Sequence, residues 1–303
     1  MLAGSEDPED LSEPLVGESR TARPEPPEVY VPALKARTLL VRMCSGAVYV
    51  ALNVAALLWG SLPTATLMSV TAGVTCWEFY RLMRADAKQP NQVLGIAFAL
   101  ILPFGGLFNP VFLIGWLFLL MACLGLWYVL SQRARITDLA VTLFGVMYTG
   151  LMLSALVMIR HAPLPDGGAT VLAVGAMASV WVNDSTAYLV GSRFGRHRLV
   201  PKISPKKSWE GLAGGIVGCV ATWLVVMAFP QANVSLPAAL LAGVACGVAG
   251  VVGDLVESRI KRGAGVKDSG NLIPGHGGLL DRSDSLLFTG TTAYFVLRIM
   301  GVI

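Results

Sequence analysis

About nine apolar runs, each long enough to cross a lipid bilayer as a helix, dominate this chain of 303 residues. A helix that spans the hydrocarbon core needs about 20 mostly apolar residues, and only helices or closed barrels satisfy every backbone polar group in lipid. Charged residues make up only 14% of the chain, against about 25% in soluble domains. The sequence therefore predicts an all-α, polytopic integral membrane protein, with spans at 39–60, 63–83, 92–108, 110–131, 138–159, 170–191, 211–229, 236–255 and 283–302.

Residues 1–37 have a different composition, in which Glu, Asp, Pro, Ser and Arg dominate. Such a segment has too little apolar surface to offset the entropy of folding, so we expect a disordered tail. The rest of the chain divides into N-terminal membrane helices at 38–160 and a C-terminal membrane region at 161–303. The second region holds the candidate catalytic residues.

Basic residues follow the alternation expected of membrane topology. They gather in loops near 81–88, 133–135, 193–207 and 259–267, whereas the opposite loops hold only Arg160 at a border. Cytoplasmic loops carry the excess of Lys and Arg, so the pattern predicts a cytoplasmic tail and a polar cavity, formed by the C-terminal half, that faces the cytoplasm. The size of the chain favours a bacterial inner (plasma) membrane over an organelle. Short basic loops between apolar runs also argue against nucleic-acid binding.

The stretch 258–284 concentrates the chemistry of the chain. Cations there suit a polyphosphate, and carboxylates suit a divalent metal, which prefers oxygen ligands. Asp281 and Asp284, at i and i+3, share one face of a helix, and Asp254 ends the preceding apolar run. These three carboxylates predict a Mg²⁺ site, for which Asp184 is a fourth candidate ligand. The alternative is a network of Asp–Arg ion pairs without a metal.

A second basic stretch precedes the helix predicted from residue 211. Ser204, Lys206 and Lys207 cluster just before that helix, whose free N–H groups and positive dipole end favour a phosphate. The alternative is that these cations only obey the topology rule and touch anionic lipid headgroups.

Two further features have structural interpretations. Glu78 lies between aromatic residues near the end of the second run, where a snorkelling position at the membrane interface is favoured over a functional role. Glycines at helix-packing spacing, such as Gly211, Gly215 and Gly218, favour close packing of helices in lipid. The same faces make a homodimer reasonable.

The motifs together resemble the signature of the phosphatidate cytidylyltransferases, also called CDP-diacylglycerol synthases. That signature combines Ser, a hydrophobic residue and Lys-Arg with a later Lys-Asp, a His-Gly-Gly and a final Asp-Arg-x-Asp. This chain supplies, in order, Ser258, Ile260, Lys261, Arg262, Lys267, Asp268, Pro274, His276, Gly277, Gly278, Asp281, Arg282 and Asp284. It departs at Ser283, where the signature is usually hydrophobic or Thr. The stretches 184–199 and 203–211 are similar to a companion motif, and the likeness extends from about residue 38 to the C-terminus.

The resemblance implies that the protein transfers a cytidylyl group from CTP to phosphatidic acid, with one or two Mg²⁺ ions. It implies catalytic roles for Asp254, Lys267, Asp281 and Arg282, and metal ligation by Asp184, Asp254, Asp281 and Asp284. The expected substrate-binding residues are Ser204, Lys206, Lys207, Ser258, Lys261, Arg262, Asp268, His276, Gly277 and Gly278. Two alternatives remain open: a CTP-dependent polyprenol or phytol kinase, and a transporter of anionic substrates.

Overall fold

The computed structural model describes residues 32–108, 110–266, 268–270, 272–273 and 277–303. Helices account for nearly all of the regular structure. Their bounds are α1 Pro32–Trp59, α2 Ser61–Ala85, α3 Gln92–Gly105, α4 Pro110–Leu130, α5 Ile136–Val146, α6 Met152–Arg160, α7 Gly168–Phe194, α8 Trp209–Met227, α9 Leu236–Gly263 and α10 Leu280–Ile299. A π-helical turn, η1 Met147–Leu151, joins α5 to α6, and a 3₁₀ turn, η2 Pro230–Ala232, precedes α9.

Each predicted apolar run is helical, and the prediction of an all-α membrane protein is confirmed at that level. Within the described residues, four helices are long and apolar enough to cross a membrane: α4, the continuous helix at 136–160, α8 and α9. The other predicted runs coincide with α1, α2, α3, α7 and α10. Of these, α3 has only 14 residues, and α10 carries three charged residues in its first turns. The number of membrane spans therefore stays a prediction.

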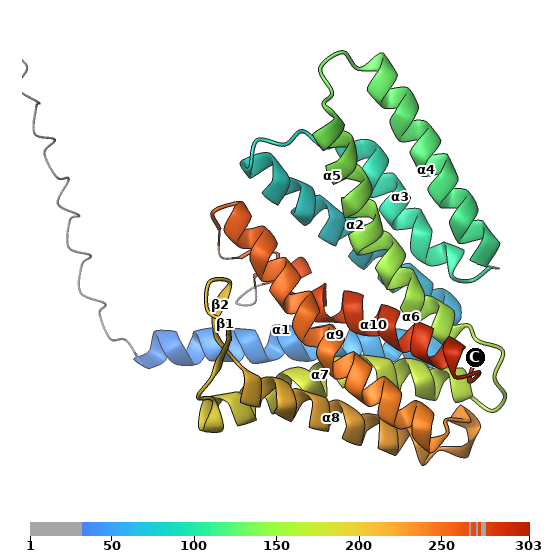
Figure 1. Cartoon of the computed structure of the whole chain (residues 1–303), viewed down its shortest axis with the longest axis vertical. Coiled ribbons are helices and arrows are strands. Elements are labelled where there is room, and N and C mark those ends of the chain that lie inside the picture. Colours follow the sequence, from blue (N-terminus) through green and yellow to red (C-terminus); the bar gives the residue numbers. More distant parts are fainter. Residues whose placement is uncertain (1–31, 109, 267, 271, 274–276) are drawn as a thin grey trace, which may run out of the picture.

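The helices form two groups that share one core. Figure 1 shows α2, α3, α4 and α5 on one side and α1, α7, α8, α9 and α10 on the other. In the second group α7 packs on α8, α8 on α9 and α9 on α10, while α6 contacts both α2 and α10. One apolar cluster runs from Leu57 to Val302 and includes helices of both groups. This core is thus continuous across the division predicted at residue 160. A second cluster lies among α3, α4 and α5 and contains Phe98, Leu102, Leu113, Leu120, Leu124 and Val146.

Glycines allow α7, α8 and α9 to approach closely. A Cβ atom on Gly215 would lie 2.1 Å from the Asn183 Oδ1 atom, and one on Gly247 would lie 2.8 Å from the Ile216 Cα atom. Both contacts join helices of the same chain, as the predicted packing role of these glycines requires. They supply no surface for the homodimer.

Three local features depart from the sequence-based expectation. A short antiparallel hairpin, β1 Arg198–Val200 and β2 Ser204–Ser208, interrupts the all-α pattern between α7 and α8. Helix α1 begins at Pro32, inside the predicted tail of residues 1–37, since Pro is well tolerated in the first turn of a helix. Helix α9 continues past residue 255 to Gly263, because 256–263 includes no strong helix breaker before its terminal glycine.

Candidate active site

The extension of α9 determines the site. Asp254, Glu257, Ser258 and Lys261 follow one another at helical spacing and therefore share one face. The Ser258 Oγ atom donates to the Asp254 Oδ1 atom at 3.1 Å. The Lys261 Nζ atom lies 2.5 Å from the Glu257 Oε2 atom. One helix face thus presents two carboxylates, a hydroxyl and an ammonium group to its neighbours.

Three carboxylates meet where α9 faces α10. One oxygen each from Asp254, Glu257 and Asp284 lies within 4.8 Å of the others, and we name this trio the acidic cluster. Glu257 is 1% exposed and Asp284 is 9% exposed. Such buried like charges are costly unless a cation compensates them.

The acidic cluster retains unused acceptor atoms. The buried Glu257 Oε1 atom has no hydrogen-bond partner among the described residues. Among the residues that the structure describes, the Asp284 Oδ1 atom accepts only from the N–H of the adjacent Ser285, at 2.7 Å. Oxygen ligands with free lone pairs, close together and buried, suit a divalent metal ion. The residues present therefore fit a metal centre.

Asp281 is placed differently, although it lies only three residues before Asp284. Its Oδ1 atom accepts a hydrogen bond from the Lys261 Nζ atom at 2.7 Å. Its Oδ2 atom accepts from the Gly278 N–H at 2.8 Å and from the Ser269 N–H and hydroxyl, each at 3.0 Å. We name these contacts the loop clamp. Both oxygens of Asp281 are thus engaged in holding the segment between α9 and α10.

A polar cavity of about 580 Å³ opens beside the acidic cluster. It lies between α7, the hairpin, α8 and α9, and its polar lining includes Asp184, Arg198, Ser204, Lys206, Lys207 and Asp254. In Figure 1 the hairpin and the C-terminal end of α9 lie toward the same side of the molecule. The Lys207 Nζ atom lies 2.6 Å from the Asp254 Oδ2 atom, so Lys207 and Asp254 join the cavity to the cluster.

The first turn of α8 is already capped by the protein. The Gly211 N–H donates to the Ser208 Oγ atom at 3.1 Å, and the Trp209 N–H donates to the His197 carbonyl at 3.0 Å. Glu210 in turn accepts the Arg196 N–H at 3.2 Å and contacts the His197 Nδ1 atom at 2.6 Å, which holds the start of the hairpin. These two helix N–H groups are therefore already satisfied, whereas the cationic side chains of Arg198, Lys206 and Lys207 line the cavity.

Three further predicted site residues lie at the surface. Arg262, Asp268 and Arg282 are exposed. Gly277 has a φ of +82°, and a Cβ atom there would lie 2.6 Å from the Asp281 Oδ2 atom, so the motif glycine makes room for that carboxylate. Lys267 and His276 lie outside the described residues.

Sequence reasoning missed two carboxylates. Glu257 was not predicted as a site residue, although its spacing from Asp254 and Lys261 would have placed it on their face had α9 been extended. The interpretation of Glu78 as a snorkelling interfacial residue is wrong, because its side chain is 0% exposed. It accepts the Leu279 and Leu280 N–H groups at the start of α10. Nothing local in the sequence links it to a helix about 200 residues later.

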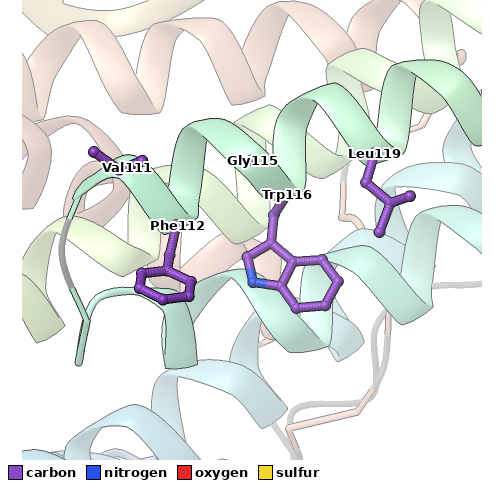
Figure 2. Close-up of a pocket in the computed structure, with 5 residues that line it drawn as sticks. All are labelled: Val111, Phe112, Gly115, Trp116 and Leu119. Carbon is purple, nitrogen blue, oxygen red and sulfur yellow. The ribbon is translucent and has the colours of Figure 1, made fainter.

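A second hollow, of about 300 Å³, lies on α4 and is purely apolar. Figure 2 shows Phe112, Trp116 and Leu119 projecting from this helix beside Gly115. Only 17% of the apolar window of α4 is buried inside the protein. With no polar lining, this surface is suited to lipid rather than to chemistry.

Comparison with known proteins supports the assignment made from these motifs. Residues 40–300 match the cytidylyltransferase family. The chain is 33% identical over 289 residues to a phosphatidate cytidylyltransferase of Synechocystis, covering 86% of this chain and 96% of that protein. It is 41% identical over 199 residues to phosphatidate cytidylyltransferase 5, chloroplastic, of Arabidopsis thaliana, covering 57% of this chain and 49% of the relative. A phosphatidate cytidylyltransferase of Mycobacterium bovis is 38% identical over 170 residues, or 56% of this chain and 54% of the relative.

The chain therefore spans about half the length of the plant and mycobacterial relatives, but nearly all of the cyanobacterial one. The family match covers the whole region that contains the acidic cluster, the loop clamp and the polar cavity. The chain belongs to the cytidylyltransferase family.

Proposed function

We propose that this protein transfers the cytidylyl group of CTP to phosphatidic acid, producing CDP-diacylglycerol and pyrophosphate. The observation that carries the proposal is the acidic cluster of Asp254, Glu257 and Asp284 next to a cavity lined by cations. Phosphoryl and nucleotidyl transfers depend mostly on positioning and on neutralising charge. The cytidylyltransferase match and the names of the relatives supply the substrate class.

The side chains of the cavity have distinct roles in this proposal. The phosphate oxygens of CTP are bound by Arg198, Lys206 and Lys207. Ser204 orients these oxygens. An oxygen of the lipid phosphate forms a bond to the α-phosphorus. The bond from that phosphorus to the oxygen bridging to the β-phosphate breaks, and its electron pair leaves with pyrophosphate. Lys261, Arg262 and Arg282, on α9 and α10, stabilise the departing anion in this proposal. Lys267, outside the described residues, is assigned the same role from its motif.

Asp254, Glu257 and Asp284 would hold Mg²⁺, and Asp184, which lines the same cavity, would serve as a ligand of a second ion. When bound, such an ion withdraws negative charge from phosphate oxygens as a Lewis acid. Lys207 contacts Asp254, so it holds this carboxylate in place while CTP enters. Asp281 acts by holding the loop clamp, which places Lys261 beside Glu257.

We place the site at the cytoplasmic face of a bacterial inner membrane, as the distribution of basic loops predicts. Residues 161–303 carry the catalytic groups in this proposal, and residues 38–160 support them. Both acyl chains then remain in lipid while the phosphate reaches the cavity. A homodimer stays a prediction.

The deciding experiment incubates the purified protein in detergent with CTP labelled at the α-phosphate, phosphatidic acid and Mg²⁺. We expect a labelled CDP-lipid and an equal amount of pyrophosphate, and no product after EDTA is added. CDP together with a phosphorylated alcohol, formed from a polyprenol or phytol acceptor, would instead indicate the kinase. Turnover in detergent, where no gradient exists, excludes transport as the primary function.

A further inference from the structure

Glu78 is a buried carboxylate that the chemistry above does not use. It lies on α2, in the group of helices that holds none of the acidic cluster. Its Oε1 atom accepts the Leu279 N–H at 3.1 Å and its Oε2 atom accepts the Leu280 N–H at 2.7 Å. The first N–H groups of a helix have no partner within the helix, and a negative charge is favoured there. Glu78 thus caps α10 from another part of the fold.

The backbone around Glu78 is shaped to admit its carboxylate. A Cβ atom on Gly278 would lie 2.7 and 2.8 Å from the two Glu78 oxygens, and one on Gly270 would lie 2.8 Å from its Oε1 atom. Any side chain at these two positions would therefore displace either the carboxylate or the segment. The segment before α10 and Glu78 fit each other as one unit.

A continuous path of contacts leads from this cap to the acidic cluster. Glu78 binds the N–H groups of residues 279 and 280, and the preceding Gly278 N–H binds Asp281. Asp281 binds Lys261, and Lys261 binds Glu257 of the cluster. A shift of the α10 N-terminus would therefore move Asp281 and Asp284 together.

We propose that Glu78 is a positioning residue for the transfer reaction. It holds the start of α10 so that Asp284 stays within the acidic cluster and Lys261 stays beside Glu257. This role rests on the proposed cytidylyl transfer, and Glu78 itself touches neither substrate nor metal. It also assigns the N-terminal helices a part in the catalytic geometry.

Asp138 provides a matched control within the chain. It is 3% exposed and also accepts two backbone N–H groups, from Gln89 at 2.7 Å and Arg135 at 3.0 Å. Those donors lie in the α2–α3 and α4–α5 connections, and Asp138 contacts no candidate site residue among those the structure describes. Loss of its charge tests the stability of a buried cap without moving α10.

The experiment compares Glu78→Gln with Asp138→Asn in the full chain. For each variant we would measure the melting temperature, kcat, the KM for CTP, and amide hydrogen exchange of residues 277–284. For Glu78→Gln we expect kcat to fall at least about tenfold, since a misplacement of about 1 Å can cost about a hundredfold. The KM for CTP should change by less than about threefold, because the hairpin cations are not displaced. Exchange in 277–284 should accelerate.

Asp138→Asn should lower the melting temperature by about as much as Glu78→Gln does, since both changes remove the charge of a buried cap. It should leave kcat and exchange in 277–284 unchanged. Near-normal kcat in Glu78→Gln, unaltered exchange in 277–284, or a parallel loss of kcat in both variants would each overturn the proposal. Hydrogen exchange also separates this inference from the proposed function. If the wild-type protein forms no CDP-lipid, accelerated exchange in Glu78→Gln still shows that Glu78 holds α10, whereas only the activity assay tests the transfer.

Discussion

The acidic cluster and the loop clamp contain the same kinds of residue in adjacent parts of α9 and α10, yet their carboxylates differ in the number of donors around them. In the loop clamp, Asp281 receives an ammonium group, two backbone N–H groups and a hydroxyl. In the acidic cluster, Glu257 and Asp254 each pair with one ammonium group. Among the described residues, however, Asp284 accepts from one neighbouring N–H, and the Glu257 Oε1 atom has no hydrogen-bond partner. A carboxylate saturated with donors holds the backbone, whereas one with free lone pairs is available to a cation. The number of donors, not the residue type, separates the two roles.

The sharpest way to break this comparison is Asp284→Asn. We expect kcat to fall by about a thousandfold, because metal charge stabilisation is worth several kcal/mol and each 1.36 kcal/mol is tenfold in rate. The melting temperature without metal should stay the same or rise, since one of three like charges is removed. Near-normal kcat would remove Asp284 from the metal centre.

Asp281→Asn tests the other side of the comparison. Here we expect a loss of both stability and activity, because the change leaves Lys261 without one of its partners and turns an amide group toward N–H donors. Removing one member of a buried ion pair costs about 3–5 kcal/mol. Activity should fall by about a hundredfold through displacement of the loop. A variant that melts like the wild type but is inactive would instead indicate direct ligation of the metal by Asp281.

A smaller effect is expected at the cavity, where Lys207 and Lys206 differ in burial and contacts. Lys207 pairs with Asp254 and is half-buried, whereas Lys206 is exposed. Lys207→Met should raise the KM for CTP by about tenfold, in line with the roughly 1.5–3 kcal/mol of a charge-assisted hydrogen bond. Lys206→Met should raise it by less than about threefold. Equal KM values in the two variants would contradict a specific role for Lys207.

The smallest effect on activity is expected from a substitution on α4, whose surface hollow is apolar, unlike the acidic cluster and the loop clamp. Leu119→Ala enlarges the apolar hollow on α4, which shares no lining residue with the polar cavity. Its side chain is 46% exposed within the protein, so kcat and KM should stay within about twofold of the wild type. A marked loss of activity would show that this surface takes part in substrate delivery.

Much of the fold and part of the site follow from local sequence. Apolar runs of bilayer length predict helices, because lipid leaves the backbone no other way to satisfy its polar groups within a single segment. The pairing of Asp254 with the α10 carboxylates was also predictable from their positions at the ends of successive runs. The end of α9 was not predictable in this way, since the apolar run ends at residue 255 whereas the helix continues to Gly263.

The sequence by itself determined that this protein is a bundle of apolar helices with cations and carboxylates confined to a few segments. Tertiary structure alone decided which hydrogen-bond partners each carboxylate has. Glu78 caps a helix about 200 residues away, and Asp281 is saturated by donors from its loop and from α9. Among the described residues, the buried Glu257 Oε1 atom has no hydrogen-bond partner. The physical reason is that a carboxylate's role depends on the donors around it, and those donors are brought together by packing between distant segments.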